Sequence, residues 1–305
     1  MLNTPILLLV FNRPEQALLV LGQIRLQQPK RLFIAADGPR ADQPGEATLC
    51  ETTRTTILNA IDWHCKVETL FRADNLGCGK AVSTAIDWFF NRVEEGIVLE
   101  DDCLPDPTFF SFCAAMLDKY RLNENIMHIN GGNYQAGTLR GNASYYFSAY
   151  AHVWGWASWR RAWQYYDFTL LRYRDASRQG LNSFMQSELR SIYKAQTDTW
   201  DIQWFMSVWF NKGLVITPNI SLVKNIGYGK NATHTHSVPK WFNKIQYGKI
   251  VDIKHPDNNN IDEEADRYSL KTLYSPGRFY MAIKKIVQNN TWLFNQCKRI
   301  YRMVN

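Results

Sequence analysis

Three consecutive carboxylates, Glu100, Asp101 and Asp102, are the side chains whose type and spacing point most clearly to chemistry. They directly follow an apolar run at residues 97–99, whose β-branched and aliphatic side chains are typical of a strand buried on both faces. Two prolines follow shortly and end regular structure, because proline lacks a backbone donor. The acids are therefore predicted to lie in the loop at the carboxyl end of a buried strand, where open α/β sheets bind ligands.

Adjacent carboxylates repel one another, and burying them unpaired would destabilise the fold. A divalent cation removes that penalty, since a hard ion takes one or two carboxylates and completes its shell with water and phosphate oxygens. We therefore predict a metal–phosphate site, with Mn²⁺ or Mg²⁺ as the cofactor, at this strand end. The alternative is a solvated acidic turn that binds nothing.

The elements that precede the acids bring further polar side chains to the same place. Strands are predicted at residues 5–11, 31–36 and 67–71, and a helix follows each of them. This alternation predicts an α/β fold, with a Rossmann-like mixed, mainly parallel sheet flanked by helices. Since the carboxyl ends of parallel strands share one edge, Arg13, Asp37 and Lys80 should lie at the same edge as Asp102.

The second half of the chain continues with helices and strands but is dominated by aromatic side chains. Helices are expected over residues 109–120, 181–195 and 201–211, and strands over 127–130 and 214–218. Residues 145–166 hold ten aromatic side chains, most of which should form core. Aromatic faces also stack on sugar rings, and Trp154, Gly155 and Trp156 place two flat rings beside a flexible backbone position. A sugar platform and plain core packing are both open there.

Asp201 lies in the first turn of a predicted helix, between Trp200 and Trp204. A carboxylate there interacts favourably with the helix dipole, so the residue is either structural or a general base. Residues 219–237 form a long, polar, glycine-bearing segment, as expected of a lid near a site. His234 and His236 in that segment are candidates for completing the metal shell.

Length and composition suit one large domain or two small ones, with 305 residues of which 46% are hydrophobic. The sequence has no run of 18 apolar residues and no basic segment at its start, so neither a membrane span nor a signal peptide is expected. None of the six cysteines forms a CxxC pair, which argues against zinc and favours a reducing cytoplasm.

The net charge of +7 comes from the end of the chain. Residues 267–305 hold eight Lys and Arg and no Asp or Glu, so the rest is close to neutral and no nucleic-acid-binding surface is expected. Residues 278–302 interleave basic and bulky apolar side chains, which favours a peripheral helix on an anionic membrane surface over a cationic helix packed on the domain. Residues 257–266 should form a mobile, acidic linker.

The order of these features resembles that of GT-A-fold glycosyltransferases, which use nucleotide-diphospho-sugars, and is similar to the N-acetylglucosaminyltransferase family that acts on mannose in N-glycan processing. The similar segments are residues 5–7 with Asn12-Arg13, Asp37-Gly38, Glu100-Asp101-Asp102, 107–110, Gly155-Trp156, Trp200-Asp201 and 217–221. The resemblance implies a transferase domain over residues 1–240, with a nucleotide-binding half at 1–106 and an acceptor-binding half at 107–240. Residues 241–305 would then be a linker and a basic C-terminal tail.

The resemblance also implies roles for individual residues. Asp102 would bind the metal that bridges the diphosphate, and Glu100 and Asp101 would contact the ribose or nearby groups. Asp37 would read the base, and Asp201 would be the catalytic base of an inverting transfer. The further candidate contacts are Phe11, Arg13 and Lys80 for the nucleotide, and Trp154, Gly155, Trp156 and Trp200 for the acceptor or sugar.

An aspartate at the base edge favours uracil, whose N3 is a donor, although guanine also presents donors. The expected partners are thus a nucleotide-sugar donor and a glycan or lipid-linked acceptor in bacterial surface polysaccharide synthesis. A UDP-sugar is favoured over a GDP-sugar as the donor. One alternative is a sugar-1-phosphate nucleotidyltransferase, which would want a glycine- and lysine-rich signature that residues 12–15 lack. The other is a non-catalytic module that binds sugar nucleotides.

Overall fold

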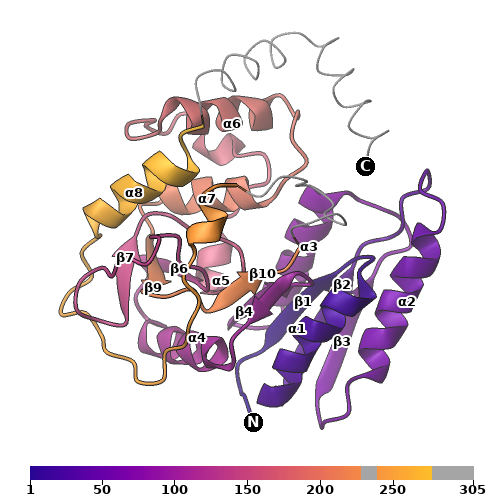
Figure 1. Ribbon diagram of the computed structural model, residues 1–305. Helices are drawn as coiled ribbons and strands as arrows, with labels where there is room; N and C mark the ends of the chain where they lie inside the picture. The colour runs from indigo at the N-terminus through magenta and orange to yellow at the C-terminus, as the bar shows by residue number, and fades with distance from the viewer. Residues whose placement is uncertain (228–238, 277–305) are drawn as a thin grey trace.

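A computed structural model describes residues 1–227 and 239–276 of the chain. In this described part, an eight-stranded sheet has the strand order β3-β2-β1-β4-β8-β6-β9-β7. The first four of these strands are parallel, and they are β1 (Ile6–Val10), β2 (Arg31–Ala36), β3 (Lys66–Phe71) and β4 (Glu95–Glu100). The predicted Rossmann-like mixed, mainly parallel sheet flanked by helices is confirmed (Figure 1).

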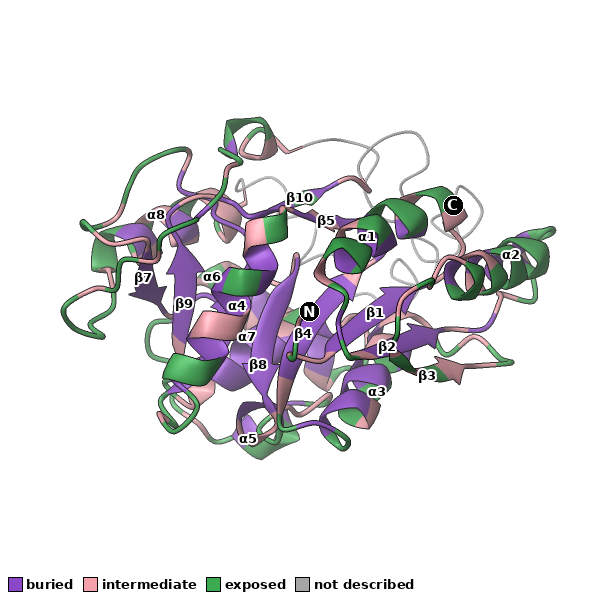
Figure 2. Ribbon diagram, turned by 90° about the horizontal axis from the view of Figure 1, so that it is seen from below, coloured by how far each residue is buried: buried purple, intermediate pink, exposed green. Residues whose placement is uncertain are grey.

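Apolar side chains on both faces of β1 and β4 explain why these strands lie in the middle of the sheet. All five residues of β1 are buried, as are residues 96–99 of β4. Helices α1 (Pro14–Gln27), α2 (Glu46–Asn59) and α4 (Pro107–Lys119) cover one face, while α3 (Cys78–Phe90), α5 (Arg160–Trp163) and α7 (Asp201–Phe210) cover the other. Figure 2 shows the buried strands between α1 and α3.

The second half of the chain extends the same sheet with mixed strand directions. Strand β8 (Trp156–Trp159) runs antiparallel to β4 and to β6 (Ile126–Asn130), and so joins the two halves. Strand β9 (Leu214–Pro218) is parallel to β6, and β7 (Tyr145–Ser148) is antiparallel to β9 at the edge. Further helical elements of this half include η1 (Leu171–Tyr173), α6 (Ser183–Tyr193) and η2 (Phe242–Lys244).

The sequence predicts that the prolines after the acids end regular structure. In the structure a short strand continues to the first of them. A turn of two residues, Asp101 and Asp102, separates β4 from β5 (Cys103–Pro105), which pairs with β10 (Val223–Asn225). Proline is tolerated because Pro105 is the last residue of a short strand in a two-stranded sheet. Glu100 is the last residue of β4 and not part of the predicted loop, whereas Asp101 and Asp102 lie between the two strands.

The expectation of a mobile acidic linker at residues 257–266 is wrong, because part of that segment starts helix α8 (Glu263–Leu273). Asp262 caps the helix by accepting from the amide of Ala265. The side chain of Gln135 donates to the carbonyl of Ala265 and to Ser269, and Ser148 donates to Asp266. Helix α8 is therefore fixed to the edge of the sheet beside β7.

Several expectations concern residues that the structure does not describe. His234, His236 and most of the expected lid belong to residues 228–238, and the basic tail at 278–302 belongs to residues 277–305. Within residues 1–227 and 239–276, no helix is long and apolar enough to cross a membrane.

Candidate functional site

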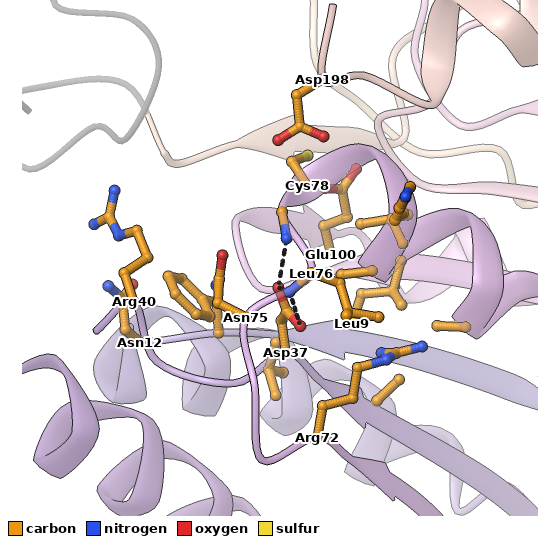
Figure 3. A pocket seen from close by; sticks show the side chains of 18 of the residues that line it. Leu9, Asn12, Asp37, Arg40, Arg72, Asn75, Leu76, Cys78, Glu100 and Asp198 are labelled. Atoms are coloured by element: carbon orange, nitrogen blue, oxygen red, sulfur yellow. Dashed lines mark hydrogen bonds between the residues drawn. The ribbon is translucent and has the colours of Figure 1, made fainter. Parts of the chain in front are cut away.

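A cavity of about 1220 Å³ opens at the carboxyl ends of β1, β2, β3 and β4. Among the described residues, it brings together all those that the sequence analysis assigned to the nucleotide or the metal: Phe11, Arg13, Asp37, Lys80, Glu100, Asp101 and Asp102. They converge because parallel strands deliver their following loops to one edge of a sheet, which is where such folds bind ligands. Figure 3 shows Asp37 and Glu100 on opposite sides of Leu76, with their carboxylates at the cavity.

Two of the three acids, Asp101 and Asp102, contact the guanidinium of Arg13. The Nη1 atom of Arg13 lies 3.2 Å from Oδ2 of Asp102 and 3.8 Å from Oδ1 of Asp101. The amide of Phe11 donates to Oδ2 of Asp101 at 3.2 Å. The side chain of Asp101 is 11% exposed, whereas that of Asp102 is 22% exposed. Of these two aspartates, Asp102 is therefore the one more open to a ligand.

The raised pKa values of Glu100 and Asp101 show that Arg13 does not fully offset burial and the repulsion among the acids. Desolvation, followed by repulsion from Asp102 and Asp101, raises the pKa of Glu100 well above its ordinary value. Desolvation and the charge of Asp102 raise the pKa of Asp101 to about 7, although Arg13 and the Phe11 amide act in the opposite direction. Within the described residues, Arg13 only partly offsets the charge of these acids, so the site favours a further cation.

The donor set fits a hard divalent ion such as Mg²⁺ or Mn²⁺, which prefers carboxylate oxygens. Residues 1–227 and 239–276 contain no group of three or more His, Cys, Asp and Glu side chains arranged to hold a metal.

Asp37 follows β2 and holds the loop after β3 in place. Its carboxylate accepts from the amide of Leu76 at 3.0 and 3.1 Å and from the amide of Gly77 at 3.2 Å (Figure 3). Burial outweighs these bonds and raises the pKa of Asp37. Asp37 lines the cavity beside Arg72 and Asn75, so a bound base would meet three polar side chains there.

Asp201 is the first residue of α7 and is exposed. It is absent from the lining of the cavity, but its charge contributes to the raised pKa values of Glu100 and of the Cys78 thiol, both of which line it. Asp201 thus lies within electrostatic reach of the cavity.

The four residues assigned to the acceptor separate into different environments. Trp156 is 0% exposed, and its ring packs against those of His128 and Trp200, so it contributes to the core and has no face available for a sugar. Trp200 is also buried. Trp154, by contrast, is half-buried and lies in a cluster with Tyr134, Trp241 and Phe242.

Gly155 serves close packing between strands. Its φ of +62° lies in the left-handed region, and a Cβ there would lie 2.8 Å from Cγ2 of Val223 and 3.2 Å from Cδ2 of Leu99. Its carbonyl accepts from the amide of Gly131 at 2.8 Å. The glycine between the two tryptophans is therefore explained by backbone geometry without reference to an acceptor.

The described part of the expected lid, residues 219–227, is built into the site. The amide of Ile226 donates to the carbonyl of Asp102 at 2.7 Å, and Nδ2 of Asn225 lies 3.4 Å from Oδ1 of Asp102. A Cβ at Gly227 would collide with Oδ2 of Asp102. This segment approaches Asp102 so closely that only glycine fits beside its carboxylate.

The sequence analysis missed several residues that line the cavity: Asn12, Arg40, Arg72, Asn75, Cys78, Phe168 and Asp198. Arg72 and Asn75 directly follow β3, so the rule applied to the other strand ends would have found them. Asp198 has no such signal, because it reaches the cavity from a segment far away in the sequence. Arg40 is held at the cavity by Glu46, whose carboxylate it contacts at 2.7 Å.

No protein-family model matches the chain, and no curated protein matches it. Among solved structures, UDP-glucose pyrophosphorylase complexed with UDP-glucose is similar at 10% identity and a TM-score of 0.38, over 80% of this chain and 97% of that one. The apo form gives 9% identity, a TM-score of 0.37 and the same coverage.

HddC from Yersinia pseudotuberculosis is similar at 15% identity and a TM-score of 0.27 over 38% of this chain, which spans 55% of the length of HddC. At TM-scores below 0.5, none of these similarities assigns a function. The fold and the cavity themselves define a mixed α/β protein with an acidic, metal-compatible cavity at the carboxyl ends of its parallel strands.

Proposed function

We propose that this protein is a metal-dependent, inverting glycosyltransferase that moves a sugar from a nucleotide-diphospho-sugar, most readily a UDP-sugar, to a glycan or lipid-linked acceptor. The observation that supports this most is the convergence of Arg13, Asp37 and the three acids on one cavity of about 1220 Å³. The cavity is large enough for a nucleotide linked to a sugar, since ligand pockets typically measure about 300–1,000 Å³.

The donor would lie along the ends of the parallel strands. Its base would lie near Asp37, Arg72 and Asn75, and its diphosphate near Arg13 and Asp102. Asp102 would hold Mn²⁺ or Mg²⁺, which acts as a Lewis acid on the phosphate oxygens of the leaving group. Lys80 also lines the cavity and would add positive charge near the phosphates.

The acceptor would approach from the second half of the chain. Asp201 would accept the proton of the attacking hydroxyl, and the half-buried ring of Trp154 would present an apolar face to a sugar. A lipid-linked acceptor in bacterial surface polysaccharide synthesis would agree with the basic residues of the tail at 278–302, which would hold the protein at an anionic membrane surface in the cytoplasm.

The experiment is a panel of UDP- and GDP-sugars incubated with Mn²⁺, candidate acceptors and the full chain, with release of the nucleoside diphosphate as the readout. Acceptor-dependent release of UDP supports the proposal. Parallel reactions with a sugar-1-phosphate and UTP test the nucleotidyltransferase alternative, whose product is pyrophosphate. Saccharide binding by calorimetry without any dependence on metal or UDP would instead favour a non-catalytic module.

A further inference from the structure

The amino terminus of helix α3 is covered by protein carboxylates. The amide of Gly79, in the first turn, donates to Oδ1 of Asp198 at 2.9 Å, and the amides of Leu76 and Gly77 donate to Asp37. Helix amino termini attract anions because their first amides are unpaired and the dipole is positive there. Two aspartates already satisfy these amides, so a phosphate group would have to displace one of them. Figure 3 shows Asp198 above Cys78 at this position.

Two glycines allow Asp198 and Thr199 to approach α3 this closely. A Cβ at Gly79 would lie 2.7 Å from the carbonyl oxygen of Thr199 and 2.8 Å from Oδ1 of Asp198. A Cβ at Gly77 would lie 2.5 Å from Oδ2 of Asp198. Any side chain at Gly77 or Gly79 would push Asp198 and Thr199 away from α3. The two glycines therefore permit this close contact.

The segment is equally fixed on its other side, to helix α7. Nε2 of Gln203 donates to the carbonyl of Thr199 at 2.7 Å, and the hydroxyl of Thr199 donates to Oε1 of Gln203 at 2.9 Å. Trp200 is buried against the ring of Trp156. Asp198 therefore connects the helix beside the cavity to the first turn of the helix that begins with Asp201.

We propose that Asp198 is a positioning residue for the carboxylate of Asp201. By accepting from the amide of Gly79, Asp198 holds the start of α7 at a fixed distance from Glu100 and Asp102. Loss of this contact should leave the proposed nucleotide-binding residues in place. The catalytic consequence rests on the proposed glycosyl transfer; the structural connection does not. A general base displaced by about 1 Å can lose about 100-fold in rate.

The test compares Asp198→Ala, Asp198→Asn and Gly79→Ala with the control Asp175→Ala, which removes an exposed aspartate outside the lining of the cavity. We expect Asp198→Ala to lower kcat by about 10- to 100-fold, with the Kd for UDP and Mn²⁺ within about twofold of wild type. Asp198→Asn keeps an oxygen acceptor for Gly79 and should stay within about threefold of wild type. Gly79→Ala displaces the same segment without changing a carboxylate and should match Asp198→Ala.

Hydrogen exchange gives a readout that does not depend on turnover. In Asp198→Ala, amides at residues 76–82 and 199–204 should exchange faster than in wild type or Asp175→Ala. Unchanged exchange, or unchanged kcat in Asp198→Ala, would overturn the proposal. A loss of UDP affinity as large as the loss of kcat would also overturn it, by indicating direct contact with the nucleotide. If wild type transfers no sugar, the proposed function fails, and exchange alone decides whether Asp198 fixes α7.

Discussion

The acid cluster in the first half of the sheet and the buried amide of Asn130 in the second half are balanced in different ways. In the first half, Asp101 and Asp102 share Arg13, and the pKa of Asp101 is raised to about 7. In the second half, the side chain of Asn130 donates to Tyr150 and Thr217 and accepts from the amide of His152, so its polar atoms are satisfied within the protein. The difference agrees with the proposal that the acid cluster binds a ligand, whereas the protein itself satisfies Asn130.

Two histidines in the second half, His128 and His152, are likewise accommodated without a buried charge. The indole of Trp204 donates to Nδ1 of His128, so the ring proton of His128 lies on Nε2 and is donated to the carbonyl of His152. Burial lowers the pKa of His128 to about 4, and burial together with His128 lowers the pKa of His152 to about 3. Both rings are neutral at pH 7, and this region needs no counter-ion.

The largest effect that tests this contrast is expected from Asp102→Ala. Removing the more exposed of the two aspartates should abolish transfer and weaken UDP binding in the presence of Mn²⁺ by about 10- to 100-fold, since one charge-assisted contact is worth about 1.5–3 kcal/mol. Calorimetric titration with UDP, with and without Mn²⁺, measures this. The free protein should be no less stable than wild type, because the change relieves repulsion on Glu100 and Asp101. Metal-dependent UDP binding at wild-type strength would contradict the assignment.

The next largest effect should come from Asp201→Asn, which keeps the size of the side chain and removes its basicity. We expect kcat to fall by about 10²- to 10⁴-fold, the usual contribution of a general base, with UDP binding unchanged. Steady-state kinetics and the same titration separate the two quantities. Transfer at the wild-type rate would show that another group accepts the proton.

The same contrast between halves determines how much could be predicted from the sequence. In the first half, each strand is followed by its own helix, and β2 was predicted with the bounds that the structure has. A local rule, that loops after parallel strands meet, was enough to bring Arg13, Asp37 and Asp102 together. Whether these residues bind a nucleotide stays a prediction.

In the second half, local patterns were insufficient because pairing joins segments far apart in the sequence. Strands β7 and β8 were hidden in the aromatic block, where Trp156 pairs with Val98 of β4 and packs under α7. The composition of residues 257–266 suggested a linker, yet contacts with Gln135 and Ser148 fix α8 on the sheet. Neither contact has a local signal, since burial of a polar side chain depends on partners that the neighbouring sequence does not contain.

A pair of tryptophan variants should sharpen the distinction between support and site. Trp156→Ala should lower the free energy of unfolding by about 3–5 kcal/mol, as expected for a large side chain that is 0% exposed. Trp154→Ala should cost less stability and act on the KM for the acceptor, since its ring is half-buried. Denaturant unfolding and acceptor kinetics measure the two effects. If the milder Trp156→Phe raised the acceptor KM at unchanged stability, the assignment of Trp156 to the core would be wrong.

The smallest effect concerns the pH dependence of α8 docking through Asp266. Burial raises the pKa of Asp266 to about 6, although Ser148 and the amide of Ala149 donate to it. Between pH 4 and 6 the folded protein therefore keeps a proton that the unfolded chain has released. Its contribution to stability is largest below about pH 4 and declines as the pH rises to about 6.

Asp266→Asn removes this titration, so the stability of wild type minus that of the variant should fall by about 2 kcal/mol from pH 4 to pH 7. The difference between the two proteins is the quantity to measure, because His128 and His152 act in the opposite direction. Their lowered pKa values make both proteins lose stability as the pH falls below about 6.5, and this loss cancels in the difference. Denaturant unfolding at several pH values gives the curve, and a difference that does not vary with pH would show that Asp266 is ionised throughout.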